Sequence, residues 1–179
     1  NPLHETETLK QKRHPAIPLP RKIYGEQRLN SYGINLSDPI ALDELDKGLD
    51  EATMKSWIAA PIVRGETLPG KHQTICNPAN KNHTIGEVTY ADEKILDYAL
   101  SLAANAANDW NNTPVEQRAD ILDQAGNLLE ENRTELMALC IREGGRTISD
   151  ALNEIREAID FCRYYAAMAR QNFAHAIEL

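Results

Sequence analysis

The sequence predicts a mostly α-helical protein that contains a few short strands. From about residue 92 almost to the end of the chain, apolar residues recur every three or four positions, as in amphipathic helices. Only two short segments, 57–63 and 84–89, have the apolar and β-branched pattern of strands. The 179 residues are enough for one ordinary domain, and 42% hydrophobic with 26% charged residues is typical of a globular chain.

Composition argues against several classes of protein. The 19 Lys and Arg against 27 Asp and Glu give a formal net charge of −8, whereas binding to nucleic-acid phosphates needs a basic surface. No apolar run approaches the roughly 20 residues that cross a bilayer, and the first residues lack the order of a secretory signal. The three cysteines form no C-x-x-C pair, which indicates free thiols in a reducing compartment. We therefore expect a cytoplasmic protein.

Residues 1–36 are expected to form an extended, proline-rich connector. Pro15, Pro18 and Pro20 fall within six positions, and each proline disfavours helix in the residue before it. The connector is either a solvated linker or a strap that lies across another domain. A basic arm that contacts DNA at residues 10–28 is a third interpretation, which the net charge disfavours. Its basic residues are Lys10, Lys12, Arg13, Arg21, Lys22 and Arg28.

Residues 37–56 are predicted to form a connector helix. Ser37 or Asp38 is suited to cap it, and Pro39 fits the first turn, where its missing N–H costs nothing. An apolar stripe follows at helical spacing, formed by Leu42, Leu45, Leu49 and Ala52.

Residues 57–63 and 84–89 are the two predicted strands. Pro61 favours an edge position for the first strand, because proline cannot donate to a sheet ladder. Turns are expected at Gly65 and Gly70.

The chain is predicted to be helical from Asp92 onward, in several segments. Thr113 is expected to cap a new helix, with Pro114 at its first position and Glu116 at its third. The Gly144–Gly145 pair is expected to end a helix, and the last helix to run from about 149 to 173. A stripe rich in small residues allows another element to approach the first of these helices; it consists of Ile95, Leu96, Ala99, Leu102, Ala103 and Ala106.

The balance of these elements predicts an incomplete structure. Several amphipathic helices and two short strands contain no sheet large enough for the helices to cover, and exposed apolar stripes of this size are rare on a monomer. We therefore expect a fragment of something larger or an obligate subunit. The alternative is a self-contained helical module whose stripes bind a partner protein.

Most candidate reactive residues have a structural interpretation. The spacing of His72, Cys76 and His83 matches no zinc motif, so we expect no metal site. Cys140 and Cys162 lie on apolar helix faces, where a buried thiol is the expected state. No histidine stands at a recognisable spacing from a nucleophile and a carboxylate, so no catalytic triad is predicted.

The last helix combines acids and aromatics at helical spacing. One interpretation is an exposed acidic face beside a core of Ile155, Ile159 and Phe161, with Arg156 and Arg163 as exposed partners. The other is a carboxylate that points into a pocket and holds a cationic group, and the pattern does not identify which acid. The residues are Glu154, Glu157, Asp160, Phe161, Tyr164 and Tyr165.

Several motifs resemble a known family. Trp110 and the segments 113–118, 128–130 and 142–147 are similar to the N-terminal region of the aldehyde dehydrogenase superfamily. Residues 154–165, EIREAIDFCRYY, resemble its glutamate semialdehyde (pyrroline-5-carboxylate) branch. The segments HPAIPLP, YG and RLNSYG within residues 14–33 resemble the connector that precedes this domain in bifunctional proline utilisation A flavoenzymes.

This resemblance implies a fold and a parent enzyme. Residues 57–179 would be the N-terminal part of an aldehyde dehydrogenase α/β fold. The parent would oxidise proline with FAD and then glutamate semialdehyde to glutamate with NAD, through a cysteine thiolate and a hydride transfer. The family's nucleophile and NAD-binding region follow the position of Leu179, and its flavin barrel precedes that of Asn1. We therefore expect no catalytic or cofactor-binding residue here, an inactive isolated segment, the remainder of the enzyme as partner, and possible homo-oligomers.

One binding position carries over from the resemblance. In the semialdehyde branch a glutamate in the Glu-Ala-Ile-Asp-Phe segment lies near the substrate's amino group, and Glu157 matches it. A carboxylate at this position forms a charge-assisted hydrogen bond to an α-ammonium. Phe161 and Tyr164 are expected to help shape the same wall of the substrate site.

Overall fold

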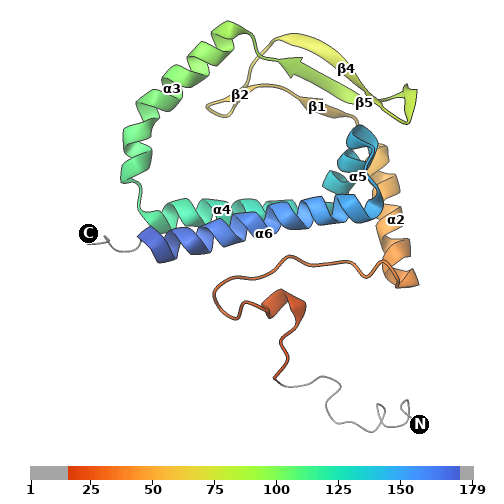
Figure 1. Ribbon diagram of the computed structural model, residues 1–179. Coiled ribbons are helices and arrows are strands. Elements are labelled where there is room, and N and C mark those ends of the chain that lie inside the picture. Colours follow the sequence, from red (N-terminus) through yellow and green to blue (C-terminus); the bar gives the residue numbers. More distant parts are fainter. Residues whose placement is uncertain (1–15, 174–179) are drawn as a thin grey trace, which may run out of the picture.

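The computed structural model describes residues 16–173, and residues 1–15 and 174–179 lie outside the description. The first part of the predicted connector, with Pro15 and the basic residues Lys10, Lys12 and Arg13, is therefore outside it. Long helices form one side of the molecule and a small sheet forms the other (Figure 1). Within residues 16–173 no helix has the length and apolar character required to cross a bilayer.

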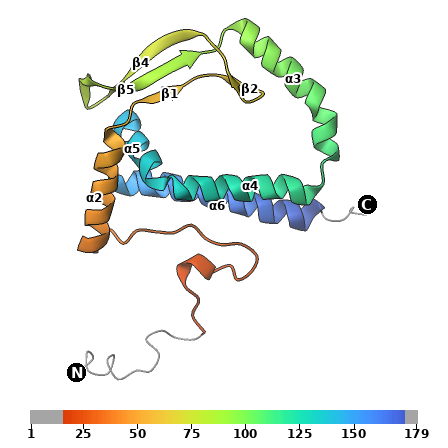
Figure 2. The ribbon, with the colours of Figure 1, turned by 180° about the vertical axis from the view of Figure 1, so that it is seen from behind.

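Two long helices lie side by side at the base of the structure. Helix α4 (Val115–Glu131) and helix α6 (Ile148–Phe173) run in opposite directions (Figures 1 and 2). A Cβ atom added at Gly126 of α4 would lie 3.4 Å from the Cβ of Cys162 and 3.5 Å from the carbonyl oxygen of Ile159. The missing side chain thus lets the two backbones approach closely, and buried alanines on both helices extend this contact.

Two shorter helices complete the core. Helix α2 (Pro39–Thr53) and helix α5 (Arg133–Gly144) contribute to one apolar cluster with α6. As predicted, Asp38 caps α2 by accepting a hydrogen bond from the Ile40 amide at 3.0 Å, and Gly145 ends α5 in the left-handed conformation at φ 65°. The buried members of the cluster are Leu45, Met137, Ala151, Leu152, Ile155 and Ile159.

A three-stranded sheet faces these helices across the molecule. Its order is β1 (Trp57–Ala59), β5 (Asn80–Tyr90) and β4 (Lys71–Asn77), with β1 parallel and β4 antiparallel to β5. A separate hairpin joins β2 (Ile62–Val63) and β3 (Glu66–Thr67).

Helix α3 (Glu93–Asn112) connects the sheet to α4 and buries none of its residues (Figure 1). The stripe of small and apolar residues predicted for this helix therefore meets no covering element within the described chain.

Strand boundaries differ most from the sequence prediction. The predicted strand 57–63 is two strands, because Ala60 and Pro61 interrupt the pairing. Strand β4 was not predicted, since its residues are mostly polar and exposed and therefore carry no burial pattern. Its partner β5 is longer than the predicted 84–89 for the same reason.

The start of α4 also differs from its prediction. The Thr113 hydroxyl donates to the carbonyl oxygen of Asp109 at 2.9 Å and so belongs to the end of α3. The helix begins at Val115, after Pro114, and no side chain caps it. Thr113, the residue predicted to cap α4, is instead part of the sharp turn between α3 and α4. A short 3₁₀ turn at Pro20–Lys22 is a further element that was not predicted.

A buried arginine joins the sheet to the helices. Arg142 of α5 donates to the carbonyl oxygen of Thr53 at 3.0 Å and to Nε2 of His83 at 3.0 Å. Its guanidinium also lies 5.4 Å from the ring centre of Trp57. The end of α2 and strands β1 and β5 thus meet at one side chain of α5.

The described part of the connector is fastened to the helices. We call residues 19–36 the strap. Glu130 of α4 accepts hydrogen bonds from the Tyr32 amide at 2.7 Å, from Arg21 at 3.1 Å and from Arg163 of α6 at 2.8 Å. The interpretation of Arg163 as an exposed partner was wrong, because the residue is only 4% exposed and faces α4.

Glu130 is held in its charged form by these contacts. Burial by itself raises the pKa of Glu130, but the hydrogen bonds from Arg163, Tyr32 and Arg21 outweigh it and leave the pKa below its usual value of 4.5. The ionised carboxylate therefore stabilises the docked strap.

Replacing Glu130 by Gln is expected to loosen the strap. Charge-assisted hydrogen bonds worth about 1.5 kcal/mol are lost, so amide hydrogen exchange in residues 21–32 should be about tenfold faster at pH 7. Hydrogen-exchange mass spectrometry measures this, with the exposed neighbour Glu131→Gln as the control. Equal exchange in both variants would show that Glu130 does not hold the strap.

The same contact has a predicted pH dependence. Because the pKa of Glu130 is lowered in the folded protein, its stabilisation is present above the ordinary pKa near 4.5 and is lost as the pH falls through the folded-state pKa. Exchange of the wild-type strap, corrected for the intrinsic rate, should become equal to that of Glu130→Gln at a pH below this lowered pKa. Persistent protection of the wild type relative to the variant at that pH is the contrary result.

Candidate functional site

The three residues predicted to bind substrate lie on one open face of α6. Glu157, Phe161 and Tyr164 are separated by four and three positions, which places them on the side of the helix opposite its buried stripe. All three are exposed, Phe161 by 49% and Tyr164 by 41%. The buried stripe on the opposite side of α6 consists of Ala151, Leu152, Ile155, Ile159, Arg163, Ala166 and Ala167.

Aromatic rings cover the second half of this face. Tyr165 stacks on Phe161 with ring centres 6.0 Å apart, and it meets Tyr164 edge-on at 5.2 Å. Phe161 was expected in the core under one interpretation, and its exposure contradicts that placement. The three rings form a continuous apolar surface beside Glu157, and we call this surface with Glu157 the α6 face.

The structure distinguishes the three acids that the pattern left equivalent. Asp160 accepts hydrogen bonds from the backbone amide and the hydroxyl of Ser31, at 2.7 and 2.8 Å. Glu154 forms an ion pair with Arg146 at 3.3 Å. Glu157 has no hydrogen-bond or ion-pair partner within residues 16–173. It is therefore the carboxylate of the three that is available to a ligand.

The strap lies along the flank of α6, beside the α6 face. Ser31 is buried, and its hydroxyl accepts a hydrogen bond from Nε of Arg156 at 3.3 Å while it donates to Asp160. Arg28 of the strap forms a longer ion pair with Asp160, at 4.0 Å. Sequence analysis did not connect these strap residues with the helix, because more than 100 positions separate them and no local pattern reports such a contact.

Two of the three thiols lie partly buried on helices. Burial and the nearby charge of Glu154 raise the pKa of the Cys140 thiol above its usual value, so the thiol stays protonated and is a poor nucleophile. Cys140 and Cys162 are half-buried, where fully buried thiols were expected, and Cys76 is exposed on β4. None of the three forms a disulfide.

The two histidines considered for a metal site each form a hydrogen bond with a different protein side chain. Nδ1 of His72 lies 3.0 Å from the Thr89 hydroxyl, and Nε2 of His83 accepts the hydrogen bond from Arg142. Over the described range 16–173, no three His, Cys, Asp or Glu side chains are grouped in a way that suits a metal ion.

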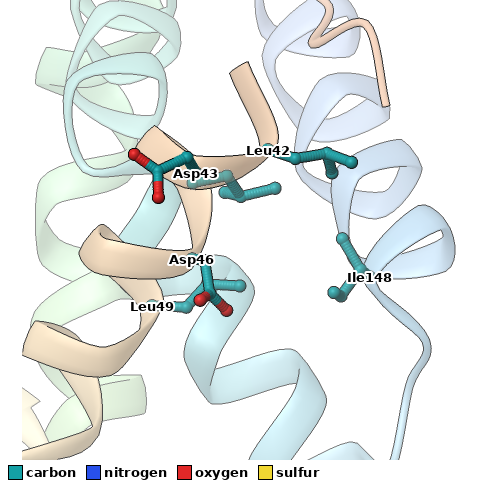
Figure 3. Close-up of a pocket in the computed structure, with 6 residues that line it drawn as sticks. Leu42, Asp43, Asp46, Leu49 and Ile148 are labelled. Atoms are coloured by element: carbon teal, nitrogen blue, oxygen red, sulfur yellow. The ribbon is translucent and has the colours of Figure 1, made fainter. Parts of the chain in front are cut away.

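A separate hollow of about 310 Å³ lies between α2 and the start of α6. Figure 3 shows Ile148 of α6 across from Leu42, Asp46 and Leu49 of α2. Asp43 at its rim pairs with Lys47 at 2.6 Å. This hollow contains none of the predicted substrate-binding residues, and no cysteine, serine, histidine or lysine lines it.

Comparison with known proteins adds to this geometry. Residues 64–178 match the family model described as the aldehyde dehydrogenase family. The chain is 39% identical to the bifunctional protein PutA of Salmonella typhimurium, over 89% of this chain and 12% of the relative. It is 36% identical to the 1-pyrroline-5-carboxylate dehydrogenase of Geobacillus sp., over 59% of this chain and 21% of that relative.

The fold resembles solved structures of the same kinds of protein. Proline utilization A from Bdellovibrio bacteriovorus superposes with a TM-score of 0.78 at 26% identity, over 92% of this chain and 17% of that chain. The 1-pyrroline-5-carboxylate dehydrogenase from Thermus with bound NAD gives a TM-score of 0.77 at 25% identity, over 84% of this chain and 30% of that chain.

The chain thus spans about an eighth of the length of the PutA relative and about a fifth of the length of the Geobacillus relative. Its mostly helical architecture with a few short strands is part of the aldehyde dehydrogenase fold. The match to the family model covers well over half of the chain, from the β2–β3 turn to its last residues. The chain belongs to the aldehyde dehydrogenase family.

Proposed function

We propose that this chain is part of an NAD-dependent L-glutamate γ-semialdehyde dehydrogenase, to which it contributes structural support and one wall of the substrate site. The observation that carries the proposal is the similarity to proteins named as 1-pyrroline-5-carboxylate dehydrogenase and PutA, combined with family membership. The unpartnered carboxylate of Glu157 beside aromatic rings supports the same assignment, because the proposed substrate carries an α-ammonium group.

The proposed reaction converts the aldehyde, NAD⁺ and water into glutamate, NADH and two protons. NAD accepts the hydride when it is bound. In the wall that we assign to this chain, Glu157 accepts a hydrogen bond from the substrate's α-ammonium, while Phe161 and Tyr164 exclude water from the substrate's methylene groups. The fixed ammonium orients the aldehyde for attack by a nucleophile outside this chain. The raised pKa of Cys140 supports leaving that role to another part of the enzyme.

We further propose that the parent enzyme also oxidises proline to pyrroline-5-carboxylate with FAD, in a region that precedes this chain. The relatives named bifunctional protein PutA and proline utilization A support this assignment. In this arrangement residues 1–36 form the connector, residues 37–56 the connector helix and residues 57–179 the first part of the dehydrogenase domain. We propose the cytoplasm as its location, which the free cysteines support.

A self-contained protein-interaction module is the second candidate. Helix α3 favours it, because this helix buries no residue and exposes Leu96, Leu100 and Trp110. Under the first proposal the remainder of the same enzyme covers these side chains. A sharp cooperative melting transition of the isolated chain supports a module, and a broad or absent transition supports a segment of the enzyme.

Glu157→Ala in the full-length enzyme is expected to raise the KM for glutamate semialdehyde by at least tenfold, because a charge-assisted hydrogen bond to the ammonium is lost. The KM for NAD should change by less than about twofold, since Glu157 does not contact the cofactor in this proposal. Steady-state kinetics with each substrate varied in turn measures both values.

Glu154→Ala is the matched control for this variant. It removes a carboxylate one turn away on the same helix, but this carboxylate is already paired with Arg146. We expect its KM for the semialdehyde to stay within about twofold of wild type. Equal increases of the two KM values in Glu157→Ala, or a larger effect of Glu154→Ala, would refute the role of Glu157.

The isolated 179-residue polypeptide is expected to have no semialdehyde dehydrogenase activity, because we assign the nucleophile and the NAD-binding region to other parts of the enzyme. Following NADH absorbance with glutamate semialdehyde and NAD tests this, and the full-length enzyme serves as the positive control. Robust turnover by the polypeptide would contradict the proposed division of labour.

A further inference from the structure

The strap makes an aromatic contact with the α6 face as well as its hydrogen bonds. The guanidinium carbon of Arg28 lies 3.7 Å from the ring centre of Tyr24, also in the strap, and 5.8 Å from the ring centre of Tyr164. Both distances are within the range of cation–π interactions. Tyr164 therefore lies near both a strap residue and Tyr165.

Arg28 also contacts a carboxylate of α6. Its side chain is mostly buried, and its Nη1 atom faces Asp160 at 4.0 Å. Asp160 in turn is fixed by the two hydrogen bonds from Ser31, so the carboxylate opposite Arg28 has one orientation. Nη1 of Arg28 forms no hydrogen bond with the described residues, so the ion pair and the two ring contacts are the interactions that place the guanidinium.

We propose that Arg28 is a positioning residue for the substrate wall, which acts through Tyr164 and needs no contact with the substrate. This inference rests on the proposed function. Arg28 limits the movement of the Tyr164 ring. Because Tyr164 contacts Tyr165 and Tyr165 stacks on Phe161, the other two rings are restricted as well. The aromatic surface beside Glu157 is thus formed before substrate binds. A strap that precedes the dehydrogenase domain in sequence thus shapes its substrate site.

The strap provides a matched control for this role. Arg21 is also stacked on a tyrosine of the strap, Tyr32, at 3.7 Å, and it is also paired with a helix carboxylate, Glu130, at 3.1 Å. Apart from Tyr32 and the carbonyl oxygen of Asn30 in the strap, its contact among the described residues is with Glu130 of α4, and it makes none with the rings of the α6 face. Loss of Arg21 therefore weakens strap docking by a similar interaction without touching Tyr164.

The test is a double-mutant cycle in the full-length enzyme with Arg28→Gln, Tyr164→Leu and the double variant. We expect Arg28→Gln to raise the KM for glutamate semialdehyde about fivefold, with kcat and the KM for NAD within about twofold of wild type. In the Tyr164→Leu background, Arg28→Gln should add less than about twofold. Arg28→Lys keeps a cation at the ring and should restore the KM to within about twofold of wild type.

Arg21→Gln should leave the KM for the semialdehyde within about twofold of wild type. If Arg28→Gln does not fold, Tyr24→Leu tests the same stack with every charge retained, and we expect a KM increase of about threefold. Thermal melting of each variant establishes that it is folded.

The inference is overturned if Arg28→Gln, or Tyr24→Leu in its place, leaves this KM unchanged, if Arg21→Gln raises it equally, or if Arg28→Gln and Tyr164→Leu act additively. Failure of the proposed function appears separately, as wild-type enzyme that does not oxidise glutamate semialdehyde. An active wild type with an unchanged KM in Arg28→Gln refutes the role of Arg28 alone.

Discussion

The close antiparallel contact of α4 and α6 is the constraint on which the rest of the structure depends. Gly126 and the buried alanines let the two backbones approach, and this approach fixes which stripe of α6 is buried. Every other residue of α6 then has its direction determined by helical geometry. Glu157 and the aromatic rings point away from the core as a consequence. Asp160 lies at a flank, where the strap binds it, and Arg163 of the buried stripe donates to Glu130 of α4.

Buried and half-buried arginines connect this helical base to the remaining elements. Arg163 and Arg21 share the carboxylate of Glu130, which joins α6, α4 and the strap. Arg142 joins α5 to the end of α2 and to the sheet. Arginine suits such positions because its planar group donates in several directions and stays charged when it is buried. These joints hold the elements in place around a small apolar core.

The sequence predicted the features that local patterns report. The cap at Asp38, the left-handed Gly145 and the amphipathic stripe of α6 follow from rules that involve neighbouring residues, and all three are present. Strand β4 escaped prediction because both of its faces are largely exposed, and Thr113 was misassigned because the end of α3 competes for its hydroxyl. Asp160 is bonded to Ser31, 129 positions away in the sequence, and Glu130 is bonded to Tyr32, 98 positions away. Sequence spacing carries no information about contacts over such separations.

A structure of the full-length enzyme with bound glutamate would test the account most directly, because the proposed product keeps the α-ammonium group. We expect the ammonium nitrogen to lie about 3 Å from a carboxylate oxygen of Glu157, with Phe161 and Tyr164 against the methylene groups. An ammonium held by other residues, with Glu157 turned into a contact with protein, would contradict the assignment of the α6 face as the substrate wall.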